Sequence, residues 1–274
     1  MEHSYWYKQN REPLFPDILW SRPESKHGAG KLAIIGGNAH GFGAAGTAFS
    51  AAEEAGAGAV YFLLPDAIQK IARHMLPDAV FAPSTPSGSF SRKALSAMFD
   101  LTASSDCVLL AGDFGRNSET AMTLEEFVHR KSGPLVITHD AVDYFKMLPL
   151  PLVDRQYTVI ALSMSQLQKV FIHTPTITPI VMSMTTVQLA EALHTYTATH
   201  PACVITKHHD LIFVAHEGKV STTLYSERIW RIKTATYASV FYMQNPQSLF
   251  ESVTTAVYEL AKAPHVGDNL QNNR

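Results

Sequence analysis

The residues with the clearest chemistry form a glycine-rich turn, Gly36 to Gly46, between an apolar run and a helical pattern. The turn holds five glycines in eleven residues. Backbone N–H groups in such a turn can approach a ligand closely, and the N-terminus of the following helix favours an anion. We therefore predict a site for a phosphate-bearing ligand. The alternative is that the glycines only permit tight turns and close packing of the helix on the sheet.

The same glycines partly match the dinucleotide-binding fingerprint G-x-G-x-x-G. Gly41-Phe-Gly43-Ala-Ala-Gly46 has this spacing, and Asp66 follows the next apolar run, about 20 residues further on. The fingerprint should begin where the strand ends, however, whereas Gly36-Gly-Asn-Ala-His intervenes here. A Rossmann dehydrogenase is therefore a less favoured alternative. A P-loop is excluded because no Gly-Lys-Ser/Thr follows the glycines.

Three carboxylates follow other apolar runs. Asp113 lies in a second glycine turn that ends at Gly115, and Asp140 and Asp143 come just after the run 134–138. Asp140 and Asp143 could meet a ligand, but Asp is also a common helix N-cap, and both interpretations stay open. Asp113 adds a negative charge that disfavours a phosphate beside it and indicates a changed ligand.

Thirteen histidines raise the question of a metal site. In the second half of the chain only His208 and His209 are closely spaced, and adjacent side chains on a strand point to opposite faces. We therefore expect no metal site. No Gly-x-Ser-x-Gly nucleophile motif occurs either.

Strands that alternate with amphipathic helices would position these residues. We expect strands at 31–36, 58–64, 106–111, 134–138 and 156–161, and helices at 43–55, 66–75, 118–130, 140–147, 163–171 and 184–199. Two or three short strands at 202–223, with a turn at Glu217-Gly218, indicate an antiparallel edge, and helices at 233–243 and 246–262 follow. The pattern predicts an α/β fold, a mainly parallel sheet with helices on both faces. We predict an N-terminal arm at 1–25, a single domain at 26–262 and a disordered tail at 263–274.

The composition is that of an ordinary globular protein. The 274 residues are 46% hydrophobic and 17% charged, with a formal net charge of −2 and a pI near 6.7. This charge gives no basic field for nucleic acid or anionic lipid, so we expect neither partner. Cys107 and Cys203 lie in apolar runs, which suits a reducing compartment, and no apolar run reaches the about 20 residues of a membrane helix. We predict a cytoplasmic protein.

Four motifs of the first half follow one another in a familiar order. They are Lys26-His-Gly28, Gly30-Lys-Leu-Ala-Ile-Ile-Gly-Gly-Asn38, Gly43-Ala-Ala and Ala55-Gly-Ala-Gly-Ala-Val60. With these motifs the chain resembles the ADP-dependent NAD(P)H-hydrate dehydratases of the ribokinase-like superfamily. The likeness continues through Asp106-Cys-Val-Leu-Leu-Ala-Gly-Asp-Phe-Gly115-Arg-Asn and Leu135-Val-Ile-Thr-His-Asp140-Ala-Val-Asp143, and so covers most of 26–145.

This resemblance implies a ribokinase-like, doubly wound α/β fold with a cleft at the carboxyl ends of the strands. Enzymes of the family are lyases of metabolite repair, which remove water from hydrated nicotinamide cofactors at the expense of a nucleoside phosphate. The implied ligands are ADP or ATP, with or without Mg²⁺, and an NAD(P)H-type molecule; the implied assembly is a homo-oligomer. The implied substrate-binding residues are Gly36, Gly37, Asn38, Gly43, Ala44, Asp113, Gly115, Asp140, Asp143 and Ser163. The implied nucleotide-binding residues are Lys207, His208, Lys233, Thr234 and Thr236.

The second half departs from the family at its functional motifs. Ala161-Leu-Ser163-Met-Ser-Gln166 replaces Thr-Pro-His-Pro-Gly-Glu, and Ile205-Thr-Lys207-His208 replaces a strand end of the type Leu-Lys-Gly. Lys233-Thr-Ala-Thr236-Tyr237 replaces Gly-Gly-Ser-Gly-Asp, and no glycine occurs between Gly218 and Gly267. Tyr237 therefore takes the position of the catalytic Asp, and a phenol with a pKa near 10 is a poor base at neutral pH.

Three cations lie around this altered motif, namely Arg228, Arg231 and Lys233. They could hold phosphates in place of the lost glycines, or they could form a solvated face. Three functions stay open. The chain is a divergent dehydratase-like protein with weakened or altered activity, a pseudoenzyme that binds a nucleotide or a protein partner, or a small-molecule kinase of the same superfamily.

Overall fold

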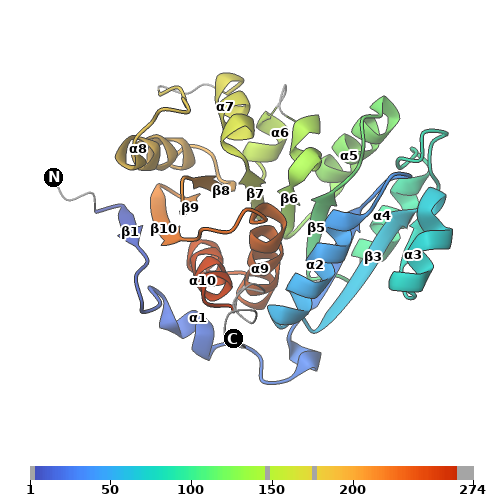
Figure 1. Cartoon of the computed structure of the whole chain (residues 1–274), viewed down its shortest axis with the longest axis horizontal. Helices are drawn as coiled ribbons and strands as arrows, with labels where there is room; N and C mark the ends of the chain where they lie inside the picture. The colour runs from blue at the N-terminus through green and yellow to red at the C-terminus, as the bar shows by residue number, and fades with distance from the viewer. Residues whose placement is uncertain (1–3, 146–148, 175–177, 264–274) are drawn as a thin grey trace, which may run out of the picture.

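Ten strands form one sheet in the computed structural model, which describes residues 4–145, 149–174 and 178–263 (Figure 1). The strands are β1 (Trp6–Lys8), β2 (Lys31–Gly36), β3 (Ala59–Pro65), β4 (Val80–Ala82), β5 (Cys107–Gly112), β6 (Leu135–Thr138), β7 (Thr158–Leu162), β8 (Cys203–His208), β9 (Leu211–His216) and β10 (Lys219–Leu224). Their order is β1-β10-β9-β8-β7-β6-β5-β2-β3-β4. Neighbours from β8 to β4 are parallel, and β8, β9 and β10 are antiparallel to one another in turn.

Helices cover both faces of the sheet. One face carries α1 (Pro16–Trp20), α2 (Gly43–Glu54), α3 (Gln69–Met75), α9 (Arg231–Gln244) and α10 (Leu249–Lys262). The other carries α4 (Ala94–Thr102), α5 (Ser118–Arg130), α6 (Leu150–Val153), α7 (Met164–Ile172) and α8 (Thr186–Thr197). Figure 1 shows α9 beside α2, although the two helices come from opposite ends of the chain. The predicted α/β fold with helices on both faces is confirmed.

Strand β2 explains why the central strands are apolar throughout. Leu32 and Ile34 point into the cluster under α2 and α9, whereas Ala33 and Ile35 point into the cluster on the other face. Successive side chains of a strand alternate between faces, so a strand covered on both faces must be apolar at every position.

The order of the strands also defines where a ligand cleft should lie. From β2 the chain moves outward to β3 and β4, then returns to β5 on the other side of β2 and continues to β8. The direction of winding therefore changes between β2 and β5. In open α/β sheets ligands bind outside the carboxyl ends of the strands at such a switch point. The turns that follow β2 and β5 are the two glycine turns of the sequence.

Several predicted elements need correction. The expected helix at 140–147 is a 3₁₀-helix at His139–Tyr144, and residues 146–148 lie outside the described residues. The helix expected at 233 begins at Arg231. The antiparallel hairpins at 203–224 are confirmed, but the outermost strand is β1, which pairs in parallel with β10.

Other elements were not predicted at all, among them β4 and α4. A three-residue strand such as β4 is too short to show alternation, and α4 has no side-chain cap to mark its start. The predicted disordered tail at 263–274 lies outside the described residues, except for residue 263. In the described part of the chain, no helix combines the length and the hydropathy that a membrane span requires.

Candidate functional site at the carboxyl ends of the strands

The N-terminus of α2, where we predicted a ligand phosphate, contacts a carboxylate of the protein itself. The backbone N–H of Ala44 donates to Asp113 Oδ2 at 2.8 Å. Asp113 holds a left-handed backbone with a φ of 60°, and its carbonyl accepts a hydrogen bond from Asn38 Nδ2 at 2.6 Å. Because helix N-termini favour anions, this carboxylate takes the place that a phosphate would take.

Close packing between the two turns accounts for several of their glycines. A Cβ at Gly36 would lie 2.6 Å from the Gly112 carbonyl oxygen, and that oxygen accepts a hydrogen bond from Gly37 N at 3.0 Å. Gly112 has a φ of 112°, and a Cβ there would lie 2.6 Å from His139 Cβ. Gly41, in contrast, faces open space. Gly37 has a φ of 95°, and a Cβ there would lie 3.2 Å from Phe42 Cβ. The packing interpretation therefore explains Gly36, Gly37 and Gly112 without a ligand.

Asp140 is the carboxyl group with the most unusual surroundings. Its Oδ2 accepts a hydrogen bond from Gly115 N at 3.1 Å, whereas its Oδ1 is buried and has no partner among the described residues. Burial raises the pKa of Asp140, and the neighbouring charge of Asp113 raises it further. The carboxylate thus holds the turn after β5 instead of capping its own 3₁₀-helix, and its pKa is raised toward the range in which it can exchange a proton. Such a group is suited to proton transfer.

Gln166 connects three parts of this end of the sheet. Its Oε1 accepts hydrogen bonds from Ser163 N at 3.1 Å and from Arg231 Nη1 at 3.0 Å, and its Nε2 donates to the His139 carbonyl at 2.8 Å. Ser163 in turn caps α7, because its hydroxyl accepts from Gln166 N. The sequence showed position 166 only as an amide in place of a carboxylate, and a contact with Arg231, 65 residues away, has no local signal.

The start of α9 brings only part of the predicted nucleotide site to the cleft. Trp230 gives the helix no side-chain cap. Thr234 and Thr236 are fully buried, and the Thr236 hydroxyl donates to the Ile232 carbonyl within the helix. The Thr234 hydroxyl has no hydrogen-bond partner among the described residues. Only the backbone of the first turn and the cations beside it remain available to a ligand.

Tyr237, which the resemblance aligns with the family Asp, is the seventh residue of α9 and belongs to the hydrophobic core. It is 4% exposed and packs in the cluster between the sheet and helices α2 and α9. Burial and the neighbouring Glu54 carboxylate raise its pKa to about 12. A phenol with this pKa stays protonated at neutral pH, so Tyr237 does not act as a general base.

The predicted cations separate into two groups. Lys207 Nζ donates to the Glu227 carbonyl at 2.8 Å, and Lys233 Nζ lies 3.1 Å from Glu227 Oε2, so one residue holds both ammonium groups. Arg231 belongs with the acidic turns: burial lowers its pKa, and the charges of Asp143 and Asp140 oppose that shift.

The remaining predicted residues have structural partners or lie on the surface. His208 is buried, and its Nε2 contacts the Met184 carbonyl at 2.8 Å; Arg228 is exposed. Among the described residues, no group of three or more His, Cys, Asp or Glu side chains is arranged to hold a metal ion.

Comparisons with known proteins agree with this fold. No family model matches the chain. A bifunctional NAD(P)H-hydrate repair enzyme from Methanothermobacter thermautotrophicus is 31% identical over 125 residues, which are 44% of this chain. The match spans 24% of that relative, about a quarter of its length.

The matches to solved structures cover more of the chain than the sequence match does. A ribokinase-like superfamily protein from Enterococcus faecalis has a TM-score of 0.74 at 17% identity, over 100% of this chain and 91% of that one. An ADP/ATP-dependent NAD(P)H-hydrate dehydratase from Bacillus subtilis, co-crystallised with ATP and Mg²⁺, has a TM-score of 0.62 at 13% identity, over 93% and 89%. The chain has the ribokinase-like fold, and its resemblance to the hydrate dehydratases is supported in both sequence and structure.

Proposed function

We propose that this chain binds ADP or ATP at the start of α9 and has lost the dehydration chemistry of the proteins it resembles. The observation that supports the loss is the absence of the Gly-Gly-Ser-Gly-Asp motif from the sequence, and Tyr237, which we align with its Asp, is a core residue with a pKa of about 12. The support for a nucleotide is the ribokinase-like fold together with the cations that gather at this helix.

The start of α9 fits the phosphates of a nucleotide. Its N–H groups have no side-chain cap, and its first turn contributes Arg231 and Lys233. Glu227 brings the ammonium groups of Lys207 and Lys233 together, and a phosphate that displaces these contacts could bind both. When bound, Mg²⁺ would neutralise part of the phosphate charge and would be held chiefly by the phosphates.

The turns after β2 and β5 fit a different group of the ligand. Asp113 already places a carboxylate on the N–H of Ala44, so a second anion there would meet like charge. We propose that a hydroxyl or a cationic group of the second ligand faces Asp113. An NAD(P)H-type molecule would then lie with its phosphates away from α2.

An altered dehydratase is a second candidate, because Asp140 could supply a proton. Elimination of water needs an acid that protonates the leaving hydroxyl group. Asp140 has a raised pKa and one buried carboxyl oxygen without a partner. A ligand hydroxyl near Oδ1 would give this oxygen a hydrogen bond and a route for the proton.

Calorimetry with ADP and ATP, with and without Mg²⁺, tests the binding proposal. We expect Lys233→Gln to weaken nucleotide binding by about tenfold, since one charge-assisted contact is lost. The control is Lys169→Gln, which changes an exposed lysine on α7 and should bind like the unaltered chain. If the unaltered chain binds neither nucleotide, the proposal is wrong.

The loss of chemistry is tested separately with hydrated NADH and NADPH. We expect no dehydration above a heat-killed control, measured by the return of the reduced-nicotinamide absorbance. Turnover that disappears in Asp140→Asn would instead support the altered dehydratase. ATP consumption with a small hydroxylated substrate would favour the kinase alternative.

A further inference from the structure

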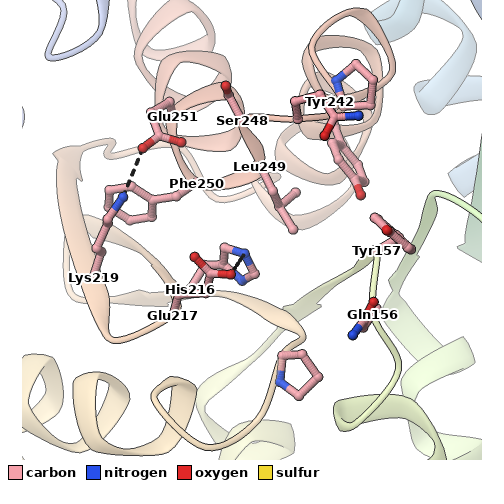
Figure 2. A pocket seen from close by; sticks show the side chains of 13 residues that line it. Gln156, Tyr157, His216, Glu217, Lys219, Tyr242, Ser248, Leu249, Phe250 and Glu251 are labelled. Carbon is pink, nitrogen blue, oxygen red and sulfur yellow. Dashed lines mark hydrogen bonds and ion pairs between the residues drawn. The ribbon is translucent and has the colours of Figure 1, made fainter.

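A separate cavity of about 480 Å³ lies at the other end of the sheet (Figure 2). Its lining includes Gln156 and Tyr157 before β7, the β9–β10 turn from His216 to Lys219, and the segment 246–251 at the start of α10. Tyr242, near the end of α9, also lines it. The volume falls within the range of about 300 to 1,000 Å³ that small-molecule sites occupy.

Tyr242 brings an unsatisfied hydroxyl to this cavity. Its side chain is 0% exposed, and its Oη has no hydrogen-bond partner among the described residues. Figure 2 shows the hydroxyl end of the ring pointing toward Tyr157 in the cavity wall. Buried hydroxyls without a partner are rare in native proteins, and a ligand atom is one of the groups that can satisfy them.

The start of α10 offers N–H groups to the same cavity. Ser248-Leu-Phe-Glu251 has the spacing of a capping box, yet the Ser248 side chain makes no cap hydrogen bond. Glu251 instead pairs with Lys219, whose Nζ lies 3.1 Å from Glu251 Oε1. In α7 and α8, by contrast, both halves of the capping box form. The first turn of α10 therefore still favours an acceptor, preferably a carboxylate.

Glu217 presents a carboxylate to the cavity, which favours a cation. Its side chain is 73% exposed, and its ion-pair contact is His216 Nε2 at 3.8 Å. Burial lowers the pKa of His216, which weakens this pairing, so the exposed Glu217 carboxylate can meet a ligand cation. Both Glu217 and Tyr157 hold left-handed backbones, with φ values of 48° and 57°. The Glu217 conformation is that of the two-residue hairpin turn between β9 and β10, in which Gly218 also has a positive φ.

From these contacts we infer that the cavity is a second ligand site, which takes a small zwitterion such as an amino acid. The ligand ammonium would bind Glu217, and the ligand carboxylate would accept hydrogen bonds from the first turn of α10 and from Ser248. Because Lys219 and Glu251 pair with each other at 3.1 Å, Glu217 would meet the ligand cation and the first turn of α10 the ligand anion. A polar atom of the ligand would reach the Tyr242 hydroxyl.

Calorimetry on the full chain tests the ligand class. The probes are glycine, β-alanine, 4-aminobutyrate and the proteinogenic amino acids, each compared with its N-acetyl and amide forms. We expect at least one zwitterion to bind and either blocked form to bind at least about tenfold more weakly, because one charge-assisted contact is lost. Equal binding of the blocked forms, or no binding by any zwitterion, would overturn the inference.

Variants place the bound zwitterion in the cavity. For the ligand found, Glu217→Gln should weaken binding by about tenfold, and Tyr242→Phe by several-fold, with circular dichroism as the check of folding. Glu125→Gln, which changes an exposed glutamate on α5 outside the lining, should leave binding unchanged. Unchanged binding in Glu217→Gln would show that the ligand binds elsewhere. ADP binding should be the same in all three variants, so this test is independent of the proposed nucleotide site.

Discussion

The two ends of the sheet differ in which polar groups the protein pairs and which it leaves without a partner. At the carboxyl end, Asp113 contacts the start of α2, and Gln166 joins the segments after β6 and β7 to α9, whereas Asp140 Oδ1 and the Thr234 hydroxyl have no partner among the described residues. At the amino end, the Tyr242 hydroxyl has no partner and α10 has no side-chain cap. The glycine motif lies at the carboxyl end, whereas the cavity at the amino end has no motif in the sequence. The motif therefore marks the end that resembles the hydrate dehydratases, and only the folded structure reveals the unpaired groups at both ends.

Both ends share one feature, which is strain in the backbone. Asp113 and His139 have φ values of 60° and 53° at the carboxyl end, and Tyr157 and Glu217 have 57° and 48° at the amino end. Left-handed backbone is unfavourable for residues with a Cβ, so the surrounding structure must hold it in place. The following experiments ask whether the two ends differ as their contacts indicate.

The largest effect is expected from Gly112→Ala at the carboxyl end. The new Cβ would be strained at a φ of 112° and would lie 2.6 Å from His139 Cβ. We expect the free energy of unfolding in urea to fall by about 3 kcal/mol or more. Gly133→Ala is the control, because its φ is 80° and no atom lies within 4 Å of the added Cβ. Its loss should be about 1 to 2 kcal/mol. Equal losses would show that the turns after β5 and β6 are not tightly packed.

Next in size is the effect of Asp113→Gly on anion binding. The variant removes the carboxylate that accepts from Ala44 N and relaxes the backbone at a φ of 60°. Inorganic phosphate should then bind at least about tenfold more tightly in calorimetry, because the start of α2 is open to it. Asp78→Gly, at an exposed position after α3, should bind phosphate as the unaltered chain does. An unchanged affinity in Asp113→Gly would contradict the idea that Asp113 replaces a phosphate.

A pair of tyrosine variants compares the two ends directly. Tyr242→Phe removes a buried hydroxyl without a partner and should raise the free energy of unfolding by about 1 kcal/mol in the absence of ligand. Tyr144→Phe removes a hydroxyl that donates to the Gly115 carbonyl at 2.5 Å, and should lower it by about 1 kcal/mol. Urea unfolding of both variants under one condition gives the comparison. If the free energy of unfolding changed in the same direction in both variants, the two hydroxyls would not differ in their pairing.

The smallest effect concerns the pH dependence that Asp140 adds. Because its pKa is raised in the folded protein, the proton is bound more tightly there than in the unfolded chain. The contribution to stability is therefore full below the unfolded pKa, near 4, and is lost as the pH rises through the folded value. The unaltered chain should lose stability relative to Asp140→Asn between pH 4 and neutral pH, as measured by urea unfolding. A constant difference across this range would contradict the raised pKa.

Much of the fold could be predicted because its signals are local. The helix at 118–130 agrees with α5 at both ends, and Asn117 caps it by accepting from Glu119 N and Thr120 N. The apolar strands were found because both faces of the sheet are covered. The 3₁₀-helix after β6 was not distinguished from an α-helix, and α9 begins two residues before the predicted position. Both differences arise at element ends, where packing and not periodicity sets the boundary.

The candidate site was less predictable because its contacts join distant residues. The sequence identified Asp113 as an unfavourable charge for a phosphate, but only the structure placed its carboxylate on the Ala44 N–H. The roles of Gln166 and Arg231 depend on their pairing across 65 residues. Lys207 and Lys233 were predicted as phosphate ligands, and the structure brings both to Glu227.

By itself, the sequence determined the class of fold, the order of most strands and helices, the family it resembles and the loss of the Gly-Gly-Ser-Gly-Asp motif. Each of these follows from residue type, period and short spacing, which the chain carries locally. The tertiary structure alone decided which polar groups are satisfied. In the folded chain Tyr237 is buried and Asp113 accepts a hydrogen bond from the start of α2. Among the described residues, the Tyr242 hydroxyl has no partner and α10 has no side-chain cap, and both line a cavity. Whether a buried polar group finds a hydrogen-bond partner depends on which distant segment lies next to it. Only the folded chain brings those segments together.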